Sequence, residues 1–143
     1  MTVTVRRAET ESAVADAFAV RREVFIEEQG VSEDEEMDGR DDEATHFVAY
    51  EDGRPVGCAR VRVPEADVGK VERVAVRETA REQGVGTAVM EAVEAWATDR
   101  GLSVLKVNAQ TRVETFYGRL GYETTSDVFQ EAGIDHVAMR KRV

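Results

Sequence analysis

Residues 71–87 read Val-Glu-Arg-Val-Ala-Val-Arg-Glu-Thr-Ala-Arg-Glu-Gln-Gly-Val-Gly-Thr, and they carry the clearest structural signal of the chain. A β-branched run ends at Arg77, a polar turn follows, and Gly84 and Gly86 then open an apolar-striped segment that ends near Arg100. The pattern predicts a strand, a turn and a helix, with Gly-x-Gly at the helix start. Several backbone N–H groups and the positive end of the helix dipole would then point at one place, which favours an anion such as a pyrophosphate.

Two better-known phosphate-binding patterns do not fit this segment. The dinucleotide-binding pattern requires a third glycine where Val89 stands, and the P-loop requires Gly-Lys-Ser/Thr, which the segment lacks. As an alternative, the two glycines of an isolated Gly-x-Gly only allow a tight turn at the start of a helix. The following residues support the helix, because they have the spacing of a core-facing stripe: Val89, Met90, Val93, Trp96 and Ala97.

A second motif follows Gly86 by 30 positions and reads Phe116-Tyr117-Gly118-Arg119-Leu120-Gly121-Tyr122. Together with Arg81-x-x-Gly84-x-Gly86 it resembles the two motifs of the GNAT N-acetyltransferases, in their usual order and separation. The resemblance implies an α/β fold with a mixed, mostly antiparallel sheet flanked by helices. In that fold the fourth and fifth strands splay apart to admit the cofactor.

The resemblance extends to a narrower group, the ElaA-like branch. Residues 20–29 resemble the opening of that branch, and residues 131–139 resemble its closing motif, in which Asp135 stands at a position usually held by proline. Gln110 stands seven positions before the motif tyrosine, where many GNAT proteins have asparagine and ElaA-like proteins have glutamine.

Length and composition predict one soluble, cytoplasmic domain over residues 1–143. The chain contains no run of about 18 apolar residues, and its N-terminus lacks the apolar core of a signal peptide. The single cysteine, Cys58, excludes an internal disulfide framework and a cysteine zinc cluster, and its β-forming neighbours favour a buried structural thiol. We expect no metal site.

The charge balance is strongly acidic. The chain has 29 acidic and 19 basic residues, a net charge of −10, and only three lysines. This charge argues against nucleic-acid binding, which needs a basic face. An acidic, lysine-poor surface is typical of proteins from salt-loaded cytoplasms, where salt screens self-repulsion, so we expect a halophilic source; an ordinary acidic protein with a cationic partner is the alternative.

The remaining pattern predicts one α/β unit without repeats. Ten of the 17 residues from Glu27 to Glu43 are acidic, which predicts a loop or a short irregular helix. Asp52-Gly53 is a strong hairpin signal, and Gly101 is a helix stop. We expect strands at 2–7, 46–50, 56–63, 70–77, 103–109, 122–129 and 135–142, and helices at 10–28, 84–100 and 112–120.

The resemblance implies acetyl-CoA as the donor and assigns residues to it. The backbone of the splayed strand at Val74, Ala75 and Val76 would hydrogen-bond the pantetheine and polarise the acetyl carbonyl. The pyrophosphate would lie in the glycine loop, with Arg77 or Arg81 near the phosphates; a merely solvated Arg77 is the alternative. The implied cofactor-binding residues outside the strand are Arg81, Gln83, Gly84, Val85, Gly86, Thr87 and Gln110.

Tyr117 is the candidate general acid. A phenol with a pKa near ~10 can protonate a departing thiolate, and the family places this tyrosine beside the sulfur. Tyr117 could instead belong to the helix core. Phe116 and Leu120, four residues apart, suit the core better, so we expect Tyr117 to face another surface.

The acceptor end is less clearly marked. Glu72 lies on the cofactor strand, where simple alternation groups it with Val74 and Val76 unless a bulge intervenes. A lone histidine is more often structural, but His46 and His136, the only two histidines, both open strands, which favours a shared substrate site; two structural roles are the alternative. We therefore expect Glu28, His46, Glu72 and His136 to contact the acceptor, with water as an alternative proton carrier.

The predicted function is transfer of the acetyl group of acetyl-CoA to a primary amine of a small molecule or peptide, by direct attack in a ternary complex. Two other classes stay open, a non-catalytic acyl-CoA-binding module and an acidic protein-interaction adaptor that uses residues 27–43. We expect no membrane or nucleic-acid partner, and a monomer or a homodimer.

Overall fold

The structure, a computed structural model, describes residues 2–143. Eight strands form one mixed sheet in the order β1-β2-β3-β4-β5-β8-β6, and β7 also pairs with β8. Every pairing is antiparallel except that of β4 with β5. The strands are β1 (Val3–Arg7), β2 (Thr45–Glu51), β3 (Arg54–Glu65), β4 (Val68–Val76), β5 (Val104–Gln110), β6 (Glu123–Thr124), β7 (Phe129–Glu131) and β8 (Ile134–Arg142).

The helical segments follow the predicted ranges closely. The predicted helix at 10–28 is continuous but changes from α-helical to π-helical geometry at Arg22. The acidic segment, predicted as a loop or a short irregular helix, contains two short helices. The helical segments are α1 (Glu11–Arg21), η1 (Arg22–Glu28), α2 (Glu33–Glu36), η2 (Asp41–Glu43), η3 (Glu78–Ala80), α3 (Val85–Asp99), η4 (Thr111–Val113) and α4 (Glu114–Arg119).

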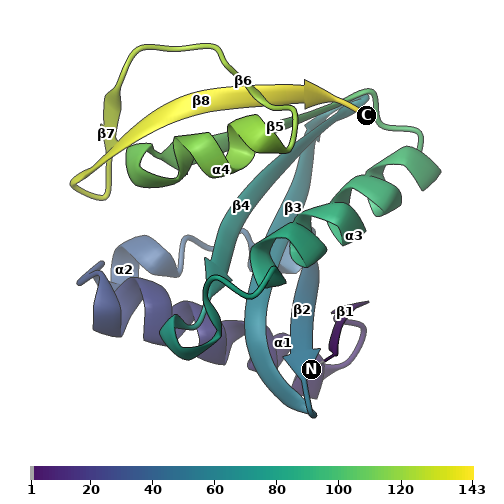
Figure 1. Cartoon of the computed structure of the whole chain (residues 1–143), viewed down its shortest axis with the longest axis vertical. Helices are drawn as coiled ribbons and strands as arrows, with labels where there is room; N and C mark the ends of the chain where they lie inside the picture. The colour runs from purple at the N-terminus through teal and green to yellow at the C-terminus, as the bar shows by residue number, and fades with distance from the viewer. Residues whose placement is uncertain (1) are drawn as a thin grey trace.

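The two central strands splay apart, which confirms the predicted fold. β4 and β5 pair only from Val68↔Val104 to Val71↔Val107, and no pairing joins them beyond that point. In Figure 1, β4 runs down toward α1 while β5, β8 and α4 form a separate upper arm. The sheet therefore opens into a V at the carboxyl ends of β4 and β5.

A hydrophobic core lies on each face of the sheet. On one face α3 buries Val89, Met90, Val93 and Ala97, while Trp96 is half-buried and meets Phe47 edge to face at 5.9 Å. On the other face α1 and η1 bury Ala17, Val20 and Val24 against Val48, Cys58 and Ala75. Cys58 is buried as predicted, and burial raises the pKa of its thiol to about 12, so it is a poor nucleophile at neutral pH.

One predicted strand is wrong in its extent. The strand expected at 122–129 is divided into β6 and β7, which pair with different parts of β8. Between them the Ser126 hydroxyl accepts a hydrogen bond from the Ala138 N–H, so a side chain replaces part of the backbone ladder. A tight turn at Ala132 and Gly133, with φ of 52° and 73°, then joins β7 to β8.

No helix in residues 2–143 has the length and apolar character needed to cross a membrane.

Candidate active site

A cleft of about 1110 Å³ occupies the V between β4 and β5. Its walls come from η1 and α2 on one side, from β5, α4 and the β7–β8 hairpin on the other, and from the first turn of α3 at one end. Most residues assigned from the sequence line it: Glu72, Val74, Ala75, Val76, Arg81, Gly84, Val85, Gly86, Thr87, Gln110, Tyr117 and His136.

A β-bulge at Arg73 gives β4 its functional face. Cys58 pairs with Ala75 and Arg60 pairs with Glu72, so β4 contains one more residue than β3 across this interval. Arg73 has φ of 57°, a left-handed conformation that L-residues rarely adopt. The Cys58 thiol donates to the Arg73 carbonyl across 3.3 Å, which contributes to holding the bulge in place.

The bulge moves Glu72 to the α1 face, away from the face of Val74 and Val76. Past the bulge, the Arg77 N–H donates to the Val56 carbonyl on β3 at 2.9 Å. Because alternate residues of an antiparallel strand point their backbone groups to opposite sides, Val74 and Val76 direct theirs into the cleft. The Val76 carbonyl in fact accepts a hydrogen bond from Arg81 Nε at 3.0 Å rather than from a strand.

The first turn of α3 closes one end of the cleft with free backbone donors. Gly84 is the N-cap with φ of 82°, and no side chain caps the helix. The first N–H groups of a helix have no partner within the helix, so those of Val85, Gly86 and Thr87 are available to an anion. Gly86 has a further role, because a Cβ there would lie 3.1 Å from the Phe116 ring.

Cationic side chains line the cleft, and Arg81, the one next to the glycine loop in the sequence, is already paired. Arg81 donates to both carboxylate oxygens of Glu28, at 2.7 and 2.6 Å, and these hydrogen bonds lower the pKa of Glu28. Arg112 and Arg119 also line the cleft, whereas Arg77 lies against Glu23 at 3.4 Å and is not part of the lining. Glu28 and Gln83 are also absent from the lining, and Gln83 donates to the Thr79 carbonyl.

Tyr117 is buried, which corrects the expected orientation of its helix. Tyr117 is 4% exposed, while Phe116 and Leu120, expected to be the core pair, are only partly buried. The helix α4 has six residues and packs rings on more than one side, with Tyr117 edge to face against Phe116 at 5.0 Å and Tyr122 at 5.7 Å. Burial raises the pKa of the Tyr117 phenol, so it stays protonated at neutral pH.

Glu72 is held by two arginines. Its Oε1 accepts from Arg60 at 2.8 Å and from Arg62 at 2.6 Å. Burial alone would raise the pKa of Glu72, but the hydrogen bonds and charges of Arg62 and Arg60 outweigh it and lower the pKa. A carboxylate that is paired in this way is a weak base, so its geometry does not favour a role in deprotonating the acceptor.

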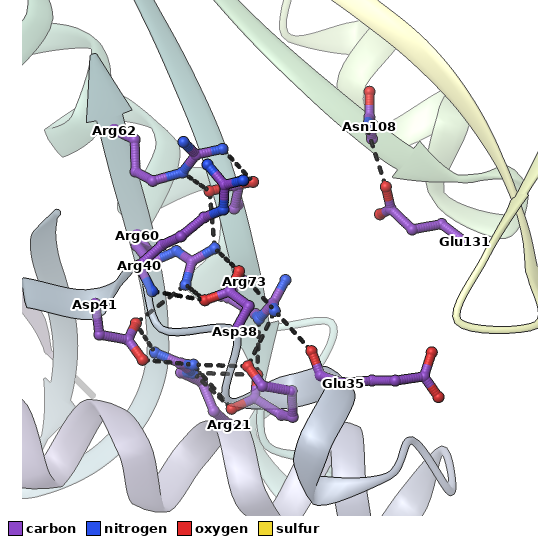
Figure 2. A network of polar contacts seen from close by, with 12 residues as sticks. Arg21, Glu35, Asp38, Arg40, Asp41, Arg60, Arg62, Arg73, Asn108 and Glu131 are labelled. Atoms are coloured by element: carbon purple, nitrogen blue, oxygen red, sulfur yellow. Dashed lines mark hydrogen bonds and ion pairs between the residues drawn. The ribbon is translucent and has the colours of Figure 1, made fainter. Parts of the chain in front are cut away.

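Glu72 belongs to a larger network of carboxylates and arginines. Figure 2 shows this network between α1, the acidic segment (residues 27–43) and the bulge at Arg73. Arg21, 1% exposed, pairs with Glu36 and Asp41, and Arg73 pairs with Glu36 at 2.8 Å. Arg60 also donates to both oxygens of Asp38, and these bonds hold the pKa of Asp38 well below its usual range. Part of the acidic segment is therefore neutralised inside the protein, which its sequence did not indicate.

The two histidines do not share a site, contrary to the expectation. His46 lies on β2 and His136 on β8, with β3, β4 and β5 between them in the sheet. The His46 ring contacts the Phe18 ring edge to face, and its Nε2 lies 3.0 Å from the Asp41 carbonyl, outside the cleft lining. His136 lines the cleft, with Nδ1 2.7 Å from the Ile134 carbonyl.

Gln110, which the sequence assigned to cofactor binding, connects the two walls of the cleft. Gln110 donates to Gln29 Oε1 at 2.9 Å and accepts from Arg112, so it links η1 to the β5 arm across the cleft. Glu131, which was not singled out from the sequence, also lines the cleft. The two-residue turn at Ala132-Gly133 was the available signal for it, because a hairpin there places Glu131 and His136 on one face of the sheet. Among residues 2–143, no group of three or more His, Cys, Asp or Glu side chains is arranged to hold a metal ion.

Comparison with known proteins shows which protein family the chain resembles. The family model for the acetyltransferase (GNAT) domain matches residues 6–143. The chain is 42% identical over 135 residues to the uncharacterized N-acetyltransferase YjcF of Bacillus subtilis (strain 168), covering 94% of this chain and 96% of YjcF. Its fold matches the crystal structure of an N-acetyltransferase candidate from Lactobacillus plantarum with a TM-score of 0.92, at 30% identity and 99% coverage of both chains.

The comparisons also bear on the narrower ElaA resemblance. Protein ElaA of Escherichia coli (strain K12) is 27% identical over 142 residues, covering 94% of this chain and 92% of ElaA. ElaA is thus a relative at low identity, and YjcF is more similar to this chain.

Proposed function

Because the chain belongs to the GNAT acetyltransferase family, we propose that it transfers the acetyl group of acetyl-CoA to a primary amine within a ternary complex. One observation carries the proposal. The cleft brings the cleft-facing backbone of β4 at Val74 and Val76 together with the uncapped first turn of α3. This arrangement suits a ligand that has an anionic group at one end and amide-bearing chain at the other, as acetyl-CoA does.

In this proposal the donor binds along β4. The N–H groups of Val85, Gly86 and Thr87 hold the pyrophosphate at the helix dipole, while Arg112 and Arg119 supply positive charge nearby. The pantetheine continues the broken ladder beside Val74 and Val76. The guanidinium of Arg81 then leaves the Val76 carbonyl and turns to the phosphates. Hydrogen bonds from the strand to the acetyl oxygen stabilise the charge that develops there in the transition state.

Acetyl transfer then requires formation of one bond, cleavage of another and transfer of protons. The amine nitrogen attacks the thioester carbonyl carbon, the C–N bond forms, and the C–S bond breaks. The departing thiolate takes the proton of the Tyr117 hydroxyl, while the new amide nitrogen loses a proton to water and water returns one to Tyr117. Burial keeps the Tyr117 phenol protonated, so its proton is available to the departing thiolate, and because burial also disfavours the resulting phenolate, water must return a proton to it.

The acidic adaptor is the weaker alternative. It needs free carboxylates on the segment from Glu27 to Glu43, yet Glu36, Asp38 and Asp41 are paired with Arg21, Arg60 and Arg73. A non-catalytic acyl-CoA-binding module would hold the cofactor in the same cleft but would not transfer the acyl group.

The experiment combines thermal unfolding with thiol detection. Stabilisation by CoA together with release of free thiol from acetyl-CoA in the presence of an amine panel supports the enzyme. Stabilisation without amine-dependent thiol release means a binding module, and no stabilisation means that the cleft does not hold the cofactor.

A further inference from the structure

The β7–β8 hairpin carries a polar pair at the acceptor side of the cleft. Phe129 pairs with His136 and Glu131 with Ile134, so all four side chains lie on one face of the hairpin. Glu131, Ile134 and His136 line the cleft, opposite η1 and α2. In Figure 1 this hairpin lies above α2 at the open end of the V.

The tautomer of His136 follows from its contacts. Its Nδ1 lies 2.7 Å from the Ile134 carbonyl, and a carbonyl can only accept, so Nδ1 carries the proton. Nε2 is then an acceptor in the neutral ring, and it has no hydrogen-bond partner in the described part of the chain. The ring is held by stacking on Phe129 at 6.0 Å, and the residue is 6% exposed.

Glu131 presents a second acceptor to the same point. Its Oε1 accepts from the Asn108 amide at 3.2 Å, which orients the carboxylate as Figure 2 shows. Its Oε2 lies 3.6 Å from His136 Nε2, beyond hydrogen-bond distance. A buried ring nitrogen and an exposed carboxylate oxygen thus face each other, and a group with several N–H donors would satisfy both.

We propose that Glu131 and His136 form the subsite that binds the primary amine of the acceptor as an alkylammonium ion. This proposal rests on the proposed function, because it assigns the acceptor of that reaction to a place in the cleft. An ammonium group has three donors, so Glu131 Oε2 and His136 Nε2 can each accept one. The carboxylate matches its charge, and the neutral amine formed by proton loss still has two donors for the same pair.

The two histidines of the chain provide a direct test. The ring C–H signals of His136 and His46 are followed by NMR in the CoA-loaded protein while n-butylammonium chloride is added, with potassium chloride at equal ionic strength as the salt control. The His136→Gln variant assigns the two signals. We expect a saturable shift at His136 and none at His46, which lies outside the cleft.

Two matched variants locate the binding charge. Glu131→Gln removes the proposed carboxylate and should weaken butylammonium binding by about tenfold or more, as expected for loss of a charged hydrogen bond. Asp135→Asn removes one charge from the same hairpin at a residue outside the cleft lining, and it should leave the affinity unchanged.

The outcomes separate this subsite from the proposed function. A silent His136, equal shifts of both histidines, or equal affinities for the Glu131→Gln and Asp135→Asn proteins would overturn the subsite, even if amine-dependent thiol release is normal. A saturable shift at His136 that Glu131→Gln abolishes would support the subsite, even if acetyl-CoA is never consumed and the proposed function fails.

Discussion

Thr87→Glu is the substitution that separates cofactor binding at α3 from stability of that helix. Thr87 lies in the first turn of α3 and lines the cleft. Gly86 is less suitable for this test, because a side chain there would meet the Phe116 ring at 3.1 Å before it reached a ligand. A glutamate in the first helical turn interacts well with the helix dipole, so the free protein should be unchanged or more stable, by ~0.3–1 kcal/mol.

The same glutamate should oppose the pyrophosphate. Two like charges ~4 Å apart repel by ~4 kcal/mol at the effective dielectric constant of a protein surface. Solvent and salt reduce this repulsion at an open cleft, so we expect ~1.4–2.8 kcal/mol, which is a ~10- to 100-fold weaker CoA affinity. Thr87→Glu should therefore preserve or raise the stability of the free protein while it weakens CoA binding.

Calorimetric titration with CoA measures this effect, and Thr98→Glu is the matched control. Thr98 is an exposed residue in the last turn of α3, where the same substitution adds the same charge far from the glycine loop. The control should lose a little stability to the helix dipole and keep normal CoA affinity. Equal CoA affinities of the two variants would refute the anion site at the start of α3.

The Tyr117→Phe protein should bind acetyl-CoA normally but transfer acetyl ~10²–10⁴-fold more slowly in single-turnover kinetics, and an unaltered rate would end the role of the phenol as the acid. With a net charge of −10, the melting temperature should rise from dilute buffer to molar potassium chloride, whereas a flat or falling trend would reject a halophilic adaptation. The pKa of Asp38 is lowered in the folded state from its ordinary 3.8, so its stabilising effect is complete above that value and is lost as the pH falls below it; Asp38→Asn should flatten this acid loss in thermal unfolding. Glu36→Gln removes the buried carboxylate shared by Arg21 and Arg73, which keep only Asp41 and Asp38 as carboxylate partners, and should cost ~1–3 kcal/mol in urea unfolding, while Glu33→Gln at an exposed position of α2 should change little.

The glycine loop and its flanking elements could be predicted from the sequence because their signals are local. The strand ending near Arg77, the helix stop at Gly101 and the hairpin at Asp52-Gly53 each depend on a few adjacent residues. The splay of β4 from β5 came from the family resemblance, since a broken ladder leaves no local pattern in the sequence.

The arginine network could not be predicted, because its partners are far apart in the chain. Residues 33–43 have the composition of a solvated acidic loop, and the arginines that neutralise it come from α1, β3 and the bulge. For the face on which Glu72 lies, the sequence left two possibilities open, simple alternation and a bulge. The bulge depends on Arg73 adopting a left-handed conformation that its sequence context does not favour.

Tyr117 shows a limit of helical spacing rules. The four-residue spacing of Phe116 and Leu120 predicts one core face, but a helix of six residues that lies under the β5–β8 arm buries a wider arc. The pairing of the histidines failed for a related reason, because similar positions at strand starts say nothing about which strands are neighbours in the sheet.

Backbone amide spectra of the isotopically labelled protein, recorded with and without CoA, test the central claim most directly. If CoA lies along β4 with its pyrophosphate at α3, the largest shift changes should fall on the amides of Val74, Val76, Val85, Gly86 and Thr87. Amides of α1 on the opposite face of the sheet, such as Ala13 and Ala15, should stay in place. Saturable CoA binding that leaves the β4 and α3 amides unshifted, or that shifts the α1 amides instead, would contradict the account.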